Sequence, residues 1–305
     1  MRVLVVGAGL CGGLLGAALI EGGADVTFLV RATRQHQLVS RLSISSPFGR
    51  YSKAVHAITS LTEGQTFDVV IVATRANVFQ LGLYFADKAI GPDTILVAAF
   101  DGAHHLGHWG ESYPGNLVAL SVIDIRASFD ADGCIHHRGV RGDLRIGSSS
   151  LKDNDRLKPL VAALNGRRFT ARLAPHSIFA RVWAKHCFSA AAIATARLEG
   201  MTLRDSLRFG RRDLFRQILR ETLAVGEAHD VKGLQFFVER YRTKFQWESS
   251  PIAIPVPISA GLQAGAEASS LVGTLLALAE RAKVRVPGLH NAYTSAASAT
   301  GGGRN

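Results

Sequence analysis

Cysteine is scarce in this sequence, since its 305 residues include only Cys11, Cys134 and Cys187. The three lie far apart and match no spacing that holds a metal ion. A disulfide-stapled secreted domain is therefore disfavoured. We expect Cys11 and Cys187 to be buried thiols of a cytoplasmic protein.

Long apolar runs are also lacking. The run Gly9–Ile20 is too short to span a bilayer, and Pro255 and Pro257 interrupt the uncharged stretch Pro251–Ala266. A signal peptide is disfavoured because the residues before Gly9 have the pattern of a strand. The sequence therefore predicts no membrane partner.

Lysine is rare as well, with eight lysines against 27 arginines in a chain of net charge +11. The arginines are scattered, and the longest basic runs are the pairs Arg167-Arg168 and Arg211-Arg212. No aromatic residues interleave with them to form a base-stacking surface. We therefore expect no nucleic-acid partner, and an excess charge that attracts an anionic cofactor or keeps the protein soluble.

The start of the chain has the pattern of a dinucleotide-binding βαβ unit. A β-branched run, a G-x-G-x-x-G loop and an apolar helix to Ile20 are followed by a second strand, Asp25–Val30. Gly7 permits the tight turn, Gly9 lets a pyrophosphate approach the backbone, and Gly12 lets helix and strand pack closely. The predicted cofactor-binding residues of this loop are Gly7, Ala8, Gly9, Leu10, Cys11 and Gly12.

Arginine stands where NAD-binding proteins carry an acid. Arg31 ends the second predicted strand, and Arg34 follows one turn later. An arginine attracts a ribose 2′-phosphate, whereas an acid repels it. The sequence therefore predicts NADPH as the cofactor; an unrelated glycine-rich turn with two solvated arginines is the alternative.

Two more candidates follow later apolar strands. Arg75 comes after Phe67–Ala73, and Asp101 comes after Thr94–Ala99. Ligands of open parallel sheets lie outside the carboxyl ends of the strands. We expect both residues to contact the cofactor, with Asp101 facing the nicotinamide; ordinary loop residues are the alternative.

The composition changes near Leu173–Pro175 from alternating strands and helices to long helices. The sequence predicts an N-terminal Rossmann-type doubly wound sheet in residues 1–173, followed by an all-α C-terminal domain in 174–305. Residues 295–305 are expected to be disordered. The Ala/Leu face Leu271–Leu278 could pair between subunits, which would give a homodimer. The predicted helices of this domain cover Ser177–Arg197, Arg211–His229, Leu234–Trp247 and Ser259–Ala282.

Lys185 and Glu267 are charged residues in apolar surroundings. Helical spacing places Lys185 on one stripe with Ile178, Val182, Ser189 and Ile193. A buried ammonium needs a partner or ligand, and it could act as a general acid; the alternative is a surface lysine. Glu267 could bind a substrate hydroxyl or orient Lys185, or could lie on a solvated helix face.

Histidines occur in two groups that could suggest a metal site. They are His104, His105, His108, His136 and His137. No carboxylate or cysteine stands beside them at a metal-binding spacing. The sequence therefore predicts no metal.

Several motifs together resemble the ketopantoate reductase (2-dehydropantoate 2-reductase) family. They are the glycine loop with Val26–Arg31, the segment Val182–Lys185, Glu267 six residues before Gly273, and Val286-Pro287. The resemblance implies NADPH-dependent reduction of a 2-keto acid to a 2-hydroxy acid. It implies Lys185 as general acid, Glu267 as ligand of the substrate hydroxyl, Arg31 on the 2′-phosphate, and Arg75 in place of a lysine.

The chain departs from the family pattern at the expected substrate contacts. Asp101, Ser189 and Ile193 stand where the family has asparagines, and Asp124 lies near its usual Thr-His pair. An aspartate facing a carboxylate substrate is repulsive. The alternatives are a biosynthetic enzyme for an imine, an amine or a bulky carbonyl compound, a non-redox cyclisation, and an NADPH-binding sensor without catalysis.

Overall fold

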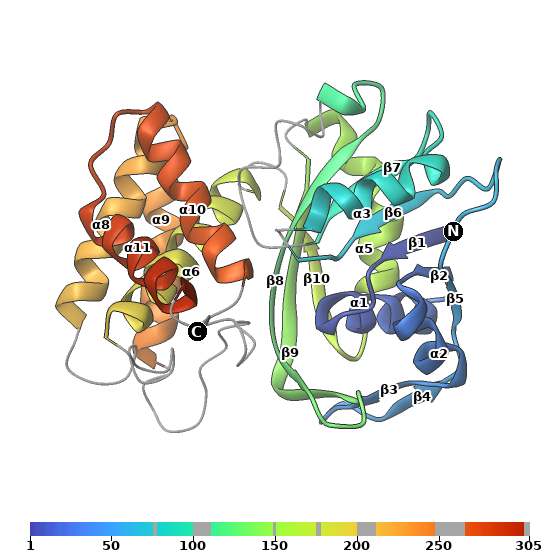
Figure 1. The fold of residues 1–305 in the computed structure, drawn as a ribbon. Coiled ribbons are helices and arrows are strands. Elements are labelled where there is room, and N and C mark those ends of the chain that lie inside the picture. The colour runs from blue at the N-terminus through green and yellow to red at the C-terminus, as the bar shows by residue number, and fades with distance from the viewer. Residues whose placement is uncertain are drawn as a thin grey trace. The chain divides into compact units, whose positions relative to one another are not determined.

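The computed structural model describes residues 1–75, 78–99, 111–148, 151–174, 178–199, 212–247 and 266–301 (Figure 1). These residues form two compact units, one up to Ile178 and one from Phe179 onward. The first unit is built on a sheet and the second consists of helices. The predicted fold class, a Rossmann-type sheet followed by an all-α region, is confirmed.

One sheet of ten strands forms the first unit. Its order is β4-β3-β9-β8-β7-β6-β1-β2-β5, and β10 pairs with β9. The strand bounds are β1 (Arg2–Val6), β2 (Asp25–Leu29), β3 (Leu42–Ser45), β4 (Tyr51–Lys53), β5 (His56–Ile58), β6 (Val69–Val72), β7 (Ile95–Ala98), β8 (Val118–Phe129), β9 (Ile135–Gly147) and β10 (Phe169–Leu173). The helical segments are α1 (Leu10–Glu21), α2 (Ala32–Ser40), α3 (Phe79–Ala86), η2 (Asp87–Ala89), η3 (Leu151–Leu157) and α5 (Lys158–Leu164).

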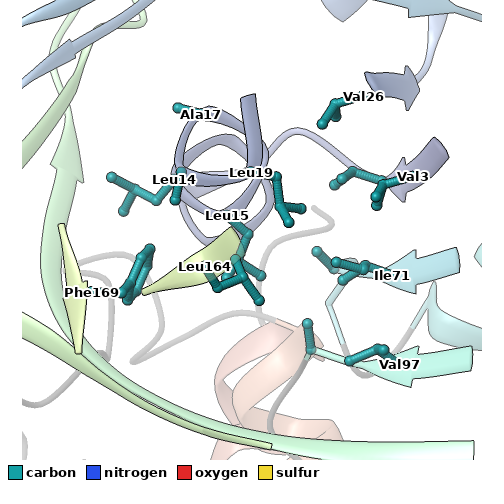
Figure 2. Packing of buried hydrophobic residues seen from close by; sticks show 14 of the residues in the cluster. Val3, Leu14, Leu15, Ala17, Leu19, Val26, Ile71, Val97, Leu164 and Phe169 are labelled. Carbon is teal, nitrogen blue, oxygen red and sulfur yellow. The ribbon is translucent and has the colours of Figure 1, made fainter. Parts of the chain in front are cut away.

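Both faces of the central strands are covered. Val69 and Ile71 belong to the core cluster that contains the buried side of α1, and Figure 2 shows Ile71 near Val3 and Leu15. Val70 and Val72 point the opposite way because strand side chains alternate. They are fully buried too, and α3 contacts β6 and β1. Coverage on both faces explains why these strands are continuous apolar runs.

Helix α1 packs closely because its buried side carries glycine. A Cβ atom on Gly16 would lie 2.1 Å from Cζ of Phe28 on β2, so the aromatic ring fills the space that glycine leaves. Burying a phenylalanine side chain contributes about 1.5–3 kcal/mol. The sequence of α1 thus fixes the distance between the helix and the sheet.

Strands β8 and β9 form one long antiparallel hairpin. The sequence pattern alone suggests three short antiparallel strands, at Ile125–Ser128, Cys134–His137 and Asp143–Ile146, and the structure joins them into this hairpin of two long strands. Of the glycines and aspartates in this region, Asp130, Asp132 and Gly133 lie in the connection between the strands, and Gly133 has φ +77°. Gly139 lies within β9 at φ +78°, and the register shifts between Asp124 and Arg126.

The second unit contains five helices among its described residues. They are α6 (Ile178–Leu198, whose first residue belongs to the first unit), α8 (Arg212–Ala228), α9 (Leu234–Trp247), α10 (Ala266–Arg281) and α11 (Pro287–Gly301). Helix α8 contacts α9, α10 and α11, and α10 contacts α11. Helix α6 is almost entirely buried from Trp183 to Ala196 because alanines occupy most of its turns. Helices α6, α8 and α9 match their predicted ranges to within one residue, and α10 lies inside the predicted range Ser259–Ala282, of which residues 259–265 are outside the described residues. Helix α11 was not predicted.

Polar side chains tie these helices together. The imidazole of His186 lies 3.0 Å from the Leu271 carbonyl oxygen, and that of His229 lies 3.1 Å from the Leu278 carbonyl oxygen. The Glu221 carboxylate accepts the backbone N–H groups of Gly288 and Leu289. It thus caps the start of α11 with a charge that suits a helix N-terminus.

Three expectations differ from the structure. Helix α11 continues to Gly301, where disorder is expected from Ser295, because the Ala/Ser run there is compatible with a helix. Leu271 and Leu275 are buried within the chain rather than forming an open face. Cys11 is half-buried rather than buried. None of the described helices is both long enough and apolar enough to cross a bilayer.

Candidate functional site

The glycine loop lies at the carboxyl ends of three neighbouring strands. Gly7 follows β1, its N–H donates to the Leu29 carbonyl at 2.9 Å, and its φ is +93°. A Cβ there would lie 3.1 Å from the Ala73 carbonyl oxygen, just past β6. Only glycine combines this backbone conformation with such a close approach. The loop is therefore held against the ends of β2 and β6.

The other two glycines of the motif differ in their surroundings. A Cβ on Gly12 would lie 1.9 Å from the Gly7 carbonyl oxygen, so the helix meets the loop backbone directly. A Cβ on Gly9 would meet no described atom within 4 Å. Gly12 is thus required by packing, whereas no described neighbour requires a glycine at position 9.

The first turn of α1 is suited to an anion. Gly9 is its N-cap without a side-chain hydrogen bond, and the turn contains no acidic residue. Ala8 is buried, and Leu10 and Cys11 are half-buried. A helix N-terminus with unshielded N–H groups and a favourable dipole attracts phosphate. This arrangement can hold the pyrophosphate of a dinucleotide.

Arg34 connects the second strand to the glycine loop. Its Nε donates to the Ala8 carbonyl at 3.3 Å, and its guanidinium lies 5.2 Å from the ring centre of Phe129. Burial lowers the pKa of the Arg34 guanidinium from its ordinary value, and the group remains a cation. Arg31 is exposed, and its carbonyl accepts the N–H groups of Arg34 and Gln35. Both predicted arginines therefore lie at the first turn of α2, and Arg34 touches the loop.

The end of β6 adds a residue that sequence reasoning missed. Arg75 is exposed there, as a loop residue would be. Beside it, Thr74 Oγ1 is buried without a hydrogen-bond partner among the described residues. The Thr74 methyl group lies 3.2 Å from the position of a Cβ on Gly7. The only available signal was a hydroxyl residue at the end of an apolar strand.

Asp124 lies on the long hairpin, directly opposite Asp143 of β9. Asp143 forms ion pairs with Arg145 at 3.1 Å and with Arg172 at 3.7 Å. This part of the sheet therefore carries charges of both signs.

Asp101 lies outside the described residues.

Lys185 lies near the middle of α6 and is only 7% exposed. The four residues on its stripe, Ile178, Val182, Ser189 and Ile193, are buried as well. A buried ammonium is costly without compensation, so its surroundings must satisfy its charge. Lys185 makes at least one polar or electrostatic contact within the chain. The structure therefore does not support a solvated surface lysine at this position.

Glu267 lies in the first turn of α10, where the structure describes the backbone and not the side chain.

Cys187, two residues after Lys185, is fully buried beside Thr222. Burial raises the pKa of its thiol to about 12, so Cys187 is no nucleophile.

Comparisons with known proteins find similarity to ketopantoate reductases and to other oxidoreductases. The sequence model described as "Ketopantoate reductase PanE/ApbA" matches residues 3–150. The uncharacterized oxidoreductase YkpB of Bacillus subtilis (strain 168) is 32% identical over 194 residues, which are 63% of this chain and 63% of that protein. The match thus spans less than two thirds of this relative's length.

Solved structures share the fold over nearly the whole chain. A 2-dehydropantoate 2-reductase from Methylococcus capsulatus has a TM-score of 0.78 at 21% identity and covers 98% of this chain and 97% of its own. A D-mandelate dehydrogenase with NADH and anilino(oxo)acetate has a TM-score of 0.85 at 14% identity, with the same coverage. At such identities the likeness shows the fold alone.

Proposed function

We propose that this protein is an NADPH-dependent reductase of a 2-keto acid or a related carbonyl compound, because the ketopantoate reductase PanE/ApbA family model matches its residues 3–150. This match supports the resemblance that the sequence motifs indicate. The reaction adds a hydride to the carbonyl carbon and a proton to its oxygen, which yields a hydroxyl group and NADP⁺.

The contact between Arg34 and the Ala8 carbonyl carries the cofactor part of the proposal. It ties a cation to the loop that would bind the pyrophosphate, with Arg31 at the same helix start. Two arginines and no acid at this position favour the 2′-phosphate of NADPH. We assign cofactor binding to the loop Gly7–Gly12, Arg31, Arg34, Arg75 and Asp101.

Lys185 is proposed as the general acid. When bound, NADPH supplies the hydride, and the ammonium donates a proton to the carbonyl oxygen as negative charge develops there. Such proton transfer contributes roughly 10²- to 10⁴-fold to rate. Its burial on α6 limits its contact with water.

The substrate contacts follow from the same family pattern. Glu267 would accept the hydrogen bond of the product hydroxyl, and Asp101, Asp124, Ser189 and Ile193 would line the substrate. We propose a cytoplasmic enzyme that acts as a homodimer on a small molecule. Light scattering of the purified chain tests the dimer.

Steady-state NADPH oxidation tests the function with a panel of 2-keto acids that includes ketopantoate, and with imines. Lys185→Ala should lower kcat at least 100-fold and leave the Kd for NADPH unchanged, whereas the exposed-site control Lys232→Ala should match the wild type. Tight NADPH binding without substrate-dependent oxidation would indicate a sensor. Substrate conversion without NADPH consumption would indicate a cyclisation, and failure to bind NADPH would overturn the proposal.

A further inference from the structure

The connection between β8 and β9 gathers three metal-binding side chains of different chemistry. One ligand atom each of Asp130, Cys134 and His136 lies within 4.8 Å of the other two. Cys134 and His136 are two residues apart at the start of β9, where side chains alternate, so they share one side. Asp130 approaches them from the end of β8.

Backbone hydrogen bonds hold Asp130 in place. Its Oδ1 accepts the N–H groups of Asp132 at 3.0 Å and Cys134 at 2.9 Å. Its own N–H donates to the Cys134 carbonyl at 3.1 Å, and Gly133 supplies the left-handed conformation that the turn needs. One carboxylate oxygen thus organises the turn, and the other, Oδ2, faces His136 Nε2 at 2.7 Å.

The neighbouring histidine shows what a purely structural imidazole looks like in this hairpin. His137 is buried, and its two nitrogens contact the Ser46 hydroxyl and the Val140 carbonyl. His136 points the other way, and its side chain is 35% exposed, with Asp130 at 37%. Cys134 is half-buried, and its thiol has a long 3.9 Å contact to the Ile135 carbonyl. An ion from solvent can therefore reach all three groups.

We propose that Asp130, Cys134 and His136 form a site for Zn²⁺, with water as the fourth ligand. Thiolate, imidazole and carboxylate are the ligands that zinc prefers, in tetrahedral geometry. Bonds of about 2.0–2.3 Å place such ligand atoms roughly 3.5 Å apart, within reach of small rotations of these side chains. Binding releases the thiol proton to solvent and replaces the Asp130–His136 contact with two bonds to the metal.

Backbone groups that would hold one of the ligands in position are already present around the site. The backbone N–H groups of Asp132 and Cys134 orient the carboxylate through Oδ1, and such outer contacts raise metal affinity. The sequence spacing does not indicate this site, because Asp130 lies six residues before His136 and the neighbouring His137 belongs to the core. The hairpin turn brings the three together.

Cobalt titration of the full chain, stripped with a chelator, tests the proposal. Co²⁺ should bind with a charge-transfer band that reports a cobalt–thiolate bond, and Zn²⁺ should displace it. Cys134→Ser should abolish the band, and His136→Gln should weaken Zn²⁺ binding at least tenfold. Asp130→Asn keeps an oxygen for the turn and should also weaken binding.

Matched variants separate this site from other ligands of the chain. Asp132→Asn in the same turn and His290→Gln on the exposed side of α11 should bind Zn²⁺ like the wild type. Cys11→Ser should keep the charge-transfer band. A band that survives Cys134→Ser, or Zn²⁺ affinity unchanged by Cys134→Ser and His136→Gln, would overturn the site. NADPH binding measured on the same samples tests the proposed function separately.

Discussion

A Cβ atom on Gly12 would lie 1.9 Å from the carbonyl oxygen of Gly7. Neither backbone can yield without moving α1 away from the end of β1. We therefore expect Gly12→Ala to lower the free energy of unfolding by about 1–3 kcal/mol, the range for forced overpacking. Urea unfolding followed by circular dichroism measures this loss.

Gly9→Ala is the matched control, because a Cβ there meets no described atom within 4 Å. It should cost less than about 1 kcal/mol in stability, as alanine is only a poorer N-cap than glycine. It should nevertheless weaken NADPH binding, since the added methyl group would stand where the pyrophosphate approaches. Equal NADPH affinity in Gly9→Ala and the wild type would contradict the proposed role of the loop.

Arg31 and Arg34 should set the preference for NADPH over NADH. Replacing either by alanine removes a charge-assisted hydrogen bond to the 2′-phosphate, which contributes about 1.5–3 kcal/mol. We expect the Kd for NADPH to rise roughly 10- to 100-fold. The Kd for NADH, which lacks this phosphate, should change little in Arg31→Ala, and fluorescence titration with both nucleotides measures the ratio. A parallel loss for both cofactors would argue for a structural role.

His137 should make stability depend on pH. Its pKa is lowered from 6.5, chiefly by burial, with the nearby Arg168 acting in the same direction. The unfolded chain therefore binds more protons than the folded one below 6.5, and stability falls as pH falls through 6.5 towards the lowered value. Thermal unfolding should show a shallower dependence in His137→Gln than in the wild type. The exposed-site variant His290→Gln should keep the wild-type slope, and identical slopes for all three proteins would refute the assignment.

Glu221 should stabilise the helical unit through α11. Its carboxylate accepts the Gly288 N–H at 2.9 Å and the Leu289 N–H at 3.2 Å. Glu221→Ala should cost about 0.5–2 kcal/mol, the range for a lost cap. Glu221→Gln keeps an acceptor and loses the charge, so it should cost about 0.3–1 kcal/mol. Urea unfolding measures both, with the exposed Glu280→Gln expected to stay within about 0.5 kcal/mol of the wild type.

Long buried elements could be read from the sequence, and short edge elements could not. Parallel strands such as β6 are covered on both faces and show as continuous apolar runs. Strands β4 and β5 have three residues each, too few for a period to appear. Strand β10 and helix α2 were missed for a related reason, since their pattern depends on neighbours that arrive from elsewhere in the chain.

Some residues of the candidate site could likewise be predicted from the sequence, and others could not. The glycine loop and Arg34 could be predicted because close backbone approach demands particular residue types at fixed spacing. Thr74 was missed because a single hydroxyl has no periodicity. The grouping of Asp130 with Cys134 and His136 depends on a turn whose strands were expected to be shorter. Lys185 stood out because a lone cation in an apolar helix is rare.

The pairing of β3 with β9 also has a consequence for biosynthesis. Ser46 and His137, which are hydrogen bonded beside this pairing, lie 91 residues apart in the chain. The ribosome therefore releases β3 long before its neighbour β9 has been synthesised. The two strands can pair only after the β8–β9 hairpin has emerged. Contacts of such long separation slow folding. Strand β3 can therefore pair with β9 only after residues 135–147 have been synthesised.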